Sequence, residues 1–295
     1  MEDQHKAGFV NILGKPNVGK STLMNALVGE RIAIITSKAQ TTRHRILGIV
    51  NGDDYQIVYS DTPGIIDPSY KMQEAMMRFV KTSLYDADVI LFLVDVKMGF
   101  DEVKDALQLL RHTEAPIILL LNKVDTLDEE DIRRMLSYWE EHFPKAHRYL
   151  PISALTQYNL DVLLELILSL LPLSPPYYDK DELTDRPERF FVAEIIREKI
   201  LLTYKDEVPY SVEIVVEEFK ERTDITYIRA DIITNRESQK PILIGKDGKK
   251  LKSVGSKARV DIEAFLQKKV YLELFVKVKE NWRDDERFLS NRGYE

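Results

Sequence analysis

The sequence predicts an α/β fold with a mostly parallel sheet, followed by a smaller α+β domain. In the first part of the chain, short apolar runs rich in Val and Ile alternate with segments of helical period. Strand–helix alternation of this kind indicates a parallel sheet with helices on both faces. The pattern stops at a Pro-rich stretch, residues 171–178. Beyond it, strands with alternating apolar residues predict a half-buried sheet.

A chain of 295 residues favours two domains. Three prolines close together are typical of a stiff, extended connector. We therefore place the boundary near residue 178, between a first domain of residues 1–178 and a second of residues 179–295.

The elements of the first domain follow from period and length. Apolar runs bounded by turn residues predict strands at residues 8–13, 57–59, 89–94 and 117–121. Helical periods predict helices at residues 21–29, 71–84, 101–112, 129–142 and 159–170. Ligands of parallel sheets bind beyond the carboxyl ends of the strands, so the motifs that follow these runs are the candidate site.

The second domain has a different order of elements. Its pattern predicts a helix at residues 186–203, strands at 210–220 and 225–234, a helix at 249–268, and then a strand at 270–279 before a C-terminal helix. The chain has neither an internal repeat nor a low-complexity tract.

Composition excludes several classes of function. Without cysteine there is no disulfide, zinc knuckle or thiol nucleophile, and the five histidines are scattered without ligand spacing. The acidic, polar start is unlike a secretory signal, and no apolar run reaches membrane-spanning length, so we expect a cytoplasmic protein. The net charge of −7 disfavours non-specific polyanion binding, but residues 240–259 hold seven basic residues and one acid.

A glycine-rich loop carries the first chemical motif. Residues 14–21, Gly-Lys-Pro-Asn-Val-Gly-Lys-Ser, follow a predicted strand and open a predicted helix. Backbone N–H groups of such a loop close around phosphates, Lys20 reaches the β- and γ-phosphates, and the Ser21 hydroxyl binds Mg²⁺. The pattern predicts a P-loop NTPase domain whose loop gives the nucleotide site Gly14, Lys15, Pro16, Asn17, Val18, Gly19, Lys20, Ser21 and Thr22.

Two further motifs narrow the ligand. Asp61 and Gly64, in Asp-Thr-Pro-Gly, are placed to hold Mg²⁺ through a water and to meet the γ-phosphate. Asp125, in Asn122-Lys123-Val-Asp125, can accept from the N1–H and the amino group of guanine, which adenine does not offer. The backbone of a later loop would meet guanine O6, and its residues are Ser153, Ala154 and Leu155.

Residues 7–171, with these motifs in this order, resemble the translation-factor-like GTPases. The resemblance implies that Thr42 closes on Mg²⁺ and the γ-phosphate, so that Mg²⁺ is bound by Ser21, Thr42 and Asp61, although Thr41 competes for this role. It also implies GTP and GDP as ligands and a catalytic set of Lys20, Thr42, Asn17 and Gly64.

Two positions suggest how hydrolysis proceeds. The residue after Gly64, where Ras-like enzymes carry the glutamine that orients water, is Ile65. Asn17, in Pro-Asn-Val-Gly-Lys, looks like the GTPases of the TrmE, Era and Der group, in which an Asn here helps hold a potassium ion that replaces an arginine finger. We therefore predict slow, potassium-stimulated hydrolysis; the competing interpretation is that Asn17 only forms a turn.

A second glycine-rich loop lies in the basic stretch. Gly245-Lys-Asp-Gly248 precedes a helical period, and glycines beside lysines suit a nucleic-acid backbone; the alternatives are a hairpin turn or a solvated basic helix face. The element order resembles a type II KH domain, which implies a short helix at about 238–244 and a loop that clamps single-stranded RNA. The expected groove floor is Ile242–Ile244 with Val254, and Gly255 marks close packing or an RNA contact. The RNA-binding candidates are Gly245, Lys246, Asp247, Gly248, Lys249, Lys250 and Lys252.

A GTPase domain followed by a KH domain resembles the Era family over nearly the whole chain. The resemblance implies a monomer that binds the 3′ end of 16S rRNA and the 30S ribosomal subunit, assists the maturation of that subunit, and attaches peripherally to the bacterial inner membrane. The alternative, favoured by Ile65, is an RNA-binding assembly protein that holds GTP as a structural ligand with negligible turnover. An RNA-modification GTPase of the TrmE kind would need a cysteine-bearing tail, which this chain lacks.

Overall fold

The computed structural model describes residues 5–36, 38 and 40–294. The chain divides into two compact units, the first ending at Asp185 and the second beginning at Arg186, with Ile34–Thr41 and Ser69–Met72 assigned to the second. This division lies seven residues beyond the boundary that we expected from the prolines.

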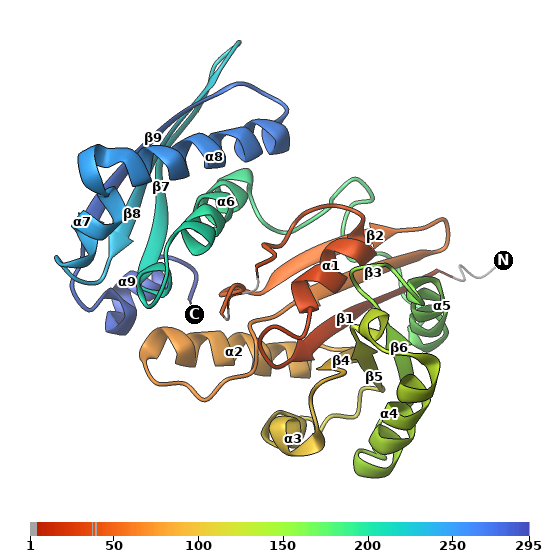
Figure 1. The fold of residues 1–295 in the computed structure, drawn as a ribbon. Helices are drawn as coiled ribbons and strands as arrows, with labels where there is room; N and C mark the ends of the chain where they lie inside the picture. The colour runs from red at the N-terminus through yellow and green to blue at the C-terminus, as the bar shows by residue number, and fades with distance from the viewer. Residues whose placement is uncertain (1–4, 37, 39, 295) are drawn as a thin grey trace. The chain divides into compact units, whose positions relative to one another are not determined.

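Within the described residues, the first unit contains a six-stranded sheet in the order β2-β3-β1-β4-β5-β6 (Figure 1). β2 pairs antiparallel with β3, and the other neighbours pair in parallel. The strands are β1 (Lys6–Gly14), β2 (Ile46–Asn51), β3 (Tyr55–Asp61), β4 (Val89–Asp95), β5 (Ile117–Asn122) and β6 (Arg148–Ile152). The helices of this unit are α1 (Lys20–Val28), α2 (Lys71–Tyr85), α3 (Phe100–Gln108), α4 (Glu129–His142) and α5 (Leu160–Leu170). The predicted mostly parallel sheet is confirmed.

β1 lies between β3 and β4 and pairs with both in parallel, so the connection from β3 to β4 crosses β1. Right-handed crossovers on the two sides put helices on opposite faces and open a crevice at the carboxyl ends of the central strands. The central strands β4 and β5 are buried along their whole length. The loop after β1 therefore lies where such sheets bind their ligands.

Two strands of this sheet, β2 and β6, were not predicted from the sequence. In β2, Gly48 interrupts the apolar run because a Cβ there would lie 2.6 Å from Val28 and 2.7 Å from Ile32. β6 contains Pro151, which removes a ladder donor and is tolerated because β6 is the edge of the sheet.

The second unit has a three-stranded sheet in the order β7-β8-β9 among its described residues. β7 and β8 are antiparallel, and β8 and β9 are parallel. Its elements are α6 (Glu188–Thr203), β7 (Val212–Glu221), β8 (Thr226–Thr234), α7 (Gln239–Ile244), α8 (Lys249–Leu266), β9 (Val270–Val278) and α9 (Glu286–Ser290). The short helix implied by the resemblance is present as α7. Apolar residues of α6, α8 and one face of the sheet form a single core.

Candidate functional site: a nucleotide site and a basic groove

The phosphate-binding loop joins the end of β1 to the start of α1. Its two glycines have positive φ angles of 149° at Gly14 and 102° at Gly19. A Cβ at Gly14 would lie 2.5 Å from the carbonyl oxygen of Leu93, and one at Gly19 would lie 2.3 Å from Nδ2 of Asn122. Backbone conformation and close neighbours both require glycine at these positions.

Lys20 is buried under this loop. Its Nζ donates to the carbonyl oxygens of Gly14 at 3.2 Å and Lys15 at 2.8 Å, so the loop curls around the ammonium group. Burial lowers the pKa of Lys20 to about 8, and the Asp61 carboxylate partly opposes this change. A phosphate bound beside this ammonium would add negative charge that favours its protonated form.

Three oxygen-bearing side chains converge beside the loop. Ser21 Oγ donates to Asp61 Oδ2 at 2.7 Å, Thr42 Oγ1 donates to the same oxygen at 3.1 Å, and the two hydroxyl oxygens are 2.9 Å apart. Burial raises the pKa of Asp61, against the opposing effects of Lys20 and the two hydroxyl donors. Its buried Oδ1 has no hydrogen-bond partner among the described residues. Hard oxygen donors with an unsatisfied carboxylate oxygen fit Mg²⁺.

The geometry separates the two threonines that competed for this role. Thr41 Oγ1 donates to the carbonyl oxygen of Lys38 at 2.7 Å and lies 2.8 Å from Thr36 Oγ1. Thr42 instead contacts Ser21 and Asp61. The structure therefore favours Thr42, whose role as a metal ligand stays a prediction.

The segment after Asp61 closes against the phosphate loop. A Cβ at Gly64 would lie 2.8 Å from the backbone nitrogen of Pro16. The N–H of Ile65 donates to the carbonyl oxygen of Gly14 at 3.1 Å, and the Ile65 side chain is buried. Ile65 is thus a packing residue, and its side chain presents no polar group that could orient water.

A second group of hydrogen-bonded side chains lies at the ends of β5 and β6. Ser153 Oγ donates to Asp125 Oδ1 at 2.6 Å and fixes that carboxylate. Asn122 Nδ2 donates to the carbonyl oxygen of Val18 at 2.7 Å, and Asn122 Oδ1 accepts the N–H of Ala154 at 3.0 Å. No hydrogen bond engages the Leu155 N–H within the described residues, so Leu155 is the better candidate for guanine O6.

Lys123 connects this group of side chains to the phosphate loop. Its Nζ donates to the carbonyl oxygen of Asn17 at 2.8 Å and forms an ion pair with Asp95 at 2.6 Å. Asp95 was not predicted, although a carboxylate that ends an apolar strand is a signal that could have found it. Asn17 is exposed with a positive φ of 64°, a backbone conformation that also suits the turn-former interpretation.

The other predicted residues of the nucleotide site lie in the same loop. Val18 is fully buried beneath it, and Lys15 and Pro16 are partly exposed along it. Thr22 belongs to the first turn of α1. The structure thus brings together every residue predicted for the nucleotide site, while their individual roles stay predictions.

The basic loop lies between α7 and α8. Gly245 and Gly248 have positive φ angles of 71° and 69°, and Asp247 between them has 52°. Gly248 is the N-cap of α8, and a Cβ there would meet nothing within 4 Å. The lysines of the loop and of the first turn of α8 are all exposed, namely Lys246, Lys249, Lys250 and Lys252.

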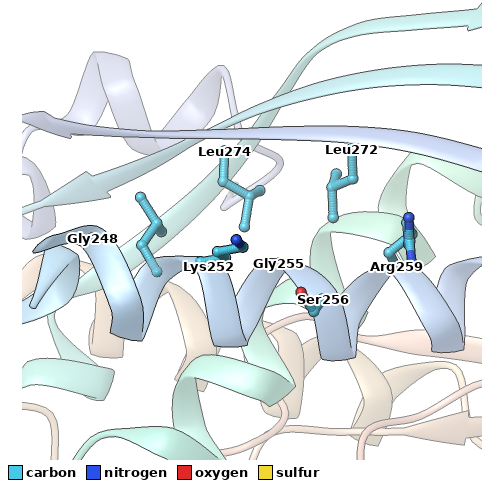
Figure 2. Close-up of a pocket in the computed structure, with 8 residues that line it drawn as sticks. Gly248, Lys252, Gly255, Ser256, Arg259, Leu272 and Leu274 are labelled. Atoms are coloured by element: carbon cyan, nitrogen blue, oxygen red, sulfur yellow. The ribbon is translucent and has the colours of Figure 1, made fainter.

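Beside this loop a groove of about 370 Å³ runs between α8 and β9 (Figure 2). Figure 2 shows Leu272 and Leu274 of β9 pointing toward α8. The groove is lined by Gly248, Leu251, Lys252, Gly255, Ser256, Arg259, Leu272 and Leu274. Its basic end and apolar floor suit a single-stranded nucleic acid whose bases pack on the leucines.

The groove floor differs from the expected one. Leu243 and Val254 are fully buried in the domain core, and Ile242 is exposed outside the groove lining. The floor comes from Leu251 and from the β9 leucines instead. Gly255 does line the groove, as one of the two interpretations of this glycine required.

Comparison with known proteins identifies both units. The family model described as 50S ribosome-binding GTPase matches residues 9–123, and the KH domain model matches residues 207–283. The chain is 48% identical to a chloroplastic ERA-like GTPase of Oryza sativa subsp. japonica over 98% of this chain and 70% of the relative. It is 44% identical to the GTPase Era of Alkaliphilus metalliredigens over 99% of both.

Solved structures agree over the same length. Era in complex with MgGDPNP and nucleotides 1506–1542 of 16S ribosomal RNA has a TM-score of 0.94 at 39% identity, covering 98% of this chain and 99% of that one. A variant of Aquifex aeolicus Era bound to GDP·AlF4⁻ has a TM-score of 0.93 with the same identity and coverage. A phosphate-binding loop, a KH domain and this identity over the full length lead to one conclusion: the chain belongs to the Era family of GTPases.

Proposed function

We propose that the protein binds Mg²⁺·GTP, hydrolyses it slowly, binds the 3′ end of 16S rRNA and assists assembly of the 30S subunit. One observation carries the proposal: a GTP site and a basic, leucine-floored groove occur in one chain. The solved Era of 39% identity that holds MgGDPNP together with 16S rRNA nucleotides supports this combination.

Crosslinking in cells followed by RNA sequencing tests the RNA target. We expect reads to concentrate at the 3′ end of 16S rRNA. A chain with Leu272→Asp in the groove is the comparison, and Tyr271→Asp, on the neighbouring exposed position of β9, is its matched control. Reads spread evenly over the rRNA, or equal enrichment with both variants, would contradict the assignment.

Each part of the nucleotide site has a role in this proposal. The Lys20 ammonium neutralises the β- and γ-phosphates, and the N–H of Gly64 donates to the γ-phosphate. Ser21, Thr42 and Asp61 would hold Mg²⁺, which neutralises phosphate charge. Asp125, fixed by Ser153, selects guanine. All of these are positioning and electrostatic roles, which supply most of the catalysis of phosphoryl transfer.

Potassium is the proposed source of the remaining charge stabilisation. The buried, apolar Ile65 side chain contributes no polar atom, and the Asn17 side chain is exposed at the phosphate loop. We expect faster phosphate release in potassium than in sodium buffer, and we expect Asn17→Ala to abolish the difference. Asn281→Ala is the matched control, because Asn281 is also exposed with a positive φ, of 54°, and lies outside the nucleotide site. Equal turnover in both salts would refute the potassium role.

The alternative is an RNA-binding assembly protein that keeps GTP as a structural ligand, which Ile65 favours. The clustering of Ser21, Thr42 and Asp61 favours a switch, since loss of the γ-phosphate would release Thr42 and Gly64. RNA affinity measured with a GTP analogue and with GDP separates the two functions. A switch requires different affinities, and a structural ligand requires equal affinities with negligible phosphate release in the presence of RNA and potassium.

Peripheral membrane attachment and a monomeric state are the remaining parts of the proposal. None of the helices in the described part of the chain has the length and apolar composition needed to cross a bilayer. Co-sedimentation with anionic vesicles and light scattering test the two expectations. A chain that stays in the supernatant, or a mass of twice 34.3 kDa, would contradict them.

A further inference from the structure

The connector that leaves the first unit, residues 171–185, packs along the sheet of that unit. Its first part pairs with β1 and the residue before it: the Ala7 N–H donates to the carbonyl oxygen of Pro172, and the Ser174 N–H donates to the carbonyl oxygen of His5. Its last part reaches β2, where the N–H of Ile49 donates to the carbonyl oxygen of Leu183 at 2.8 Å. The prolines therefore do not produce a free spacer.

Gln56, at the start of β3, holds the middle of the connector. It is fully buried, and its Oε1 accepts the N–H groups of Tyr177 at 2.7 Å and Tyr178 at 3.0 Å. Its Nε2 donates to the carbonyl oxygen of Tyr178 and to Oδ1 of Asn51, both at 2.8 Å. Four hydrogen bonds satisfy this buried amide completely, and three of them are made to the connector.

We name the β2 seam the set of hydrogen bonds from Leu47, Ile49, Asn51 and Gln56 to connector residues 177–185. The N–H of Leu47 donates to Oδ1 of Asp185 at 3.3 Å, and Asn51 Nδ2 donates to the carbonyl oxygen of Lys180 at 3.0 Å. Residues 47 and 49 point their N–H groups away from β3, as the alternation of an antiparallel strand requires. The seam therefore covers the edge of β2 that β3 leaves unpaired.

The other edge of β2 adjoins the nucleotide site. Ile46 pairs directly with Asp61 of β3, and Thr42 precedes β2 by four residues. Neighbouring strands lie about 5 Å apart, so a single strand separates the proposed Mg²⁺ carboxylate from the connector. At its far end the connector joins α6 through a short link, because α6 begins at Glu188, three residues after Asp185. A displacement of Asp185 is therefore passed to the start of α6.

We infer that the β2 seam relays the state of the nucleotide to the second unit. This inference rests on the proposed switch and specifies the element that transmits it. When Thr42 and Asp61 hold Mg²⁺·GTP, the start of β2 is fixed and the seam is closed. Loss of the γ-phosphate releases Thr42, weakens the start of β2 and loosens the connector that leads into α6.

Hydrogen exchange of the β2 amides tests the relay directly. We expect the Leu47 and Ile49 amides to exchange about fivefold more slowly with a GTP analogue than with GDP, which corresponds to about one net hydrogen bond. Arg45 is a competing anchor, since its Nε donates to Ser60 at 2.7 Å and could isolate β2 from Thr42. Equal exchange rates with both nucleotides would mean that Arg45 isolates β2 from Thr42, and would overturn the inference.

Gln56→Leu tests the coupling, with Gln108→Leu on the exposed face of α3 as the matched control. We expect Gln56→Leu to retain GTP affinity within about twofold and to lose the difference in RNA affinity between GTP analogue and GDP. Asn51→Ala, which removes the bond to Lys180, is the milder variant if the buried substitution prevents folding. A variant that folds and keeps the full nucleotide dependence refutes the relay.

The outcomes separate this inference from the proposed function. If the unchanged chain binds RNA equally with both nucleotides, the switch fails, and the exchange experiment alone decides whether the seam responds to nucleotide. If the unchanged chain discriminates and both seam variants discriminate equally well, the switch stands and the relay is wrong.

Discussion

The two glycine loops of this protein have similar sequences and opposite surroundings. Gly19 and Gly248 are both the N-cap of a helix, both have a positive φ, and both precede a lysine. Around Gly19 the space is filled, and the following Lys20 is buried. Around Gly248 a Cβ would meet nothing within 4 Å, and Lys249 is exposed.

The difference fits the two ligands that we propose for these loops. A nucleoside triphosphate is small and is recognised on all sides, so a closed loop can fix each phosphate with preorganised donors. A single RNA strand is long and flexible, and an open loop with exposed lysines can follow its backbone while an adjacent groove takes the bases. The same backbone conformation thus occurs in an enclosed loop in one domain and in an open loop in the other.

The largest expected effect comes from adding one carbon to the closed loop. Gly19→Ala should lower GTP affinity at least about 100-fold, because the new Cβ meets Asn122 and the backbone becomes strained. Gly29→Ala introduces the same kind of strain, at φ 79°, with no atom within 4 Å, and should retain affinity. Titration with a fluorescent GTP analogue measures both, and equal losses would show that strain alone accounts for the effect.

The next effect tests how specific the closed site is. Asp125→Asn should lower GTP affinity about 10³-fold, because the new amide places a donor against the amino group of guanine. The same donor complements the O2 of xanthine, so affinity for xanthosine triphosphate should rise. Asp128→Asn is the control, since Asp128 only caps α4 and asparagine caps equally well. Competition binding gives the ratio, and an unchanged preference would exclude Asp125 from base recognition.

A smaller effect is expected at the open loop. Replacing Lys246 and Lys249 together with Ala should weaken RNA binding and reduce the salt dependence of log K by about 1.4, or about 0.7 for each phosphate contact. Replacing Lys220 of β7 and Lys268 of the turn before β9 removes the same charge outside the loop, where each lysine pairs with a glutamate. RNA titrations at several salt concentrations distinguish an effect of the position of the lysines from an effect of the change in net charge. An equal change in slope for both pairs would mean that the loop makes no local contacts.

The smallest effect joins stability to binding. Gly255→Ala should raise the free energy of unfolding by about 0.5–1 kcal/mol, because glycine is costly inside a helix. The new Cβ would stand 3.4 Å from Leu274 and narrow the groove, so RNA affinity should fall severalfold. Ser253→Ala is the control, because it raises helix propensity on the exposed face of α8 and Ser253 does not line the groove. Urea denaturation measures the free energy of unfolding, and RNA titration measures RNA affinity. Only Gly255→Ala should raise the first and lower the second.

The sequence was most informative where chemistry is local. The residues of the phosphate loop are consecutive, so spacing alone brings Gly14, Lys20 and Ser21 together. Thr42 could not be separated from Thr41, because the decision depends on contacts with Asp61, nineteen residues away. The β2 seam was out of reach for the same reason, since Gln56 meets residues more than 120 positions later.

The groove shows a second limit. The helical period placed Val254 on an apolar face of α8. The period alone does not say whether that face packs in the core or contacts a ligand. That choice depends on β9, whose Leu272 and Leu274 pack across the groove while Val254 turns into the core. Gly255 gave the better signal, because a glycine inside a helix needs a reason beyond helix formation.

Asn122 gives the nucleotide site one further property. Its side chain bonds to Val18 in the phosphate loop and to Ala154 beside Ser153 and Asp125, the residues proposed to bind guanine, so one amide sets the spacing of both halves. Because Asn122 already holds this spacing, a molecule that contains both guanosine and phosphates loses its translational and rotational freedom only once, whereas two separate fragments each lose it. Fragments of the nucleotide should therefore be poor inhibitors individually. The binding free energy of the whole nucleotide should be more favourable than the sum of the binding free energies of its fragments.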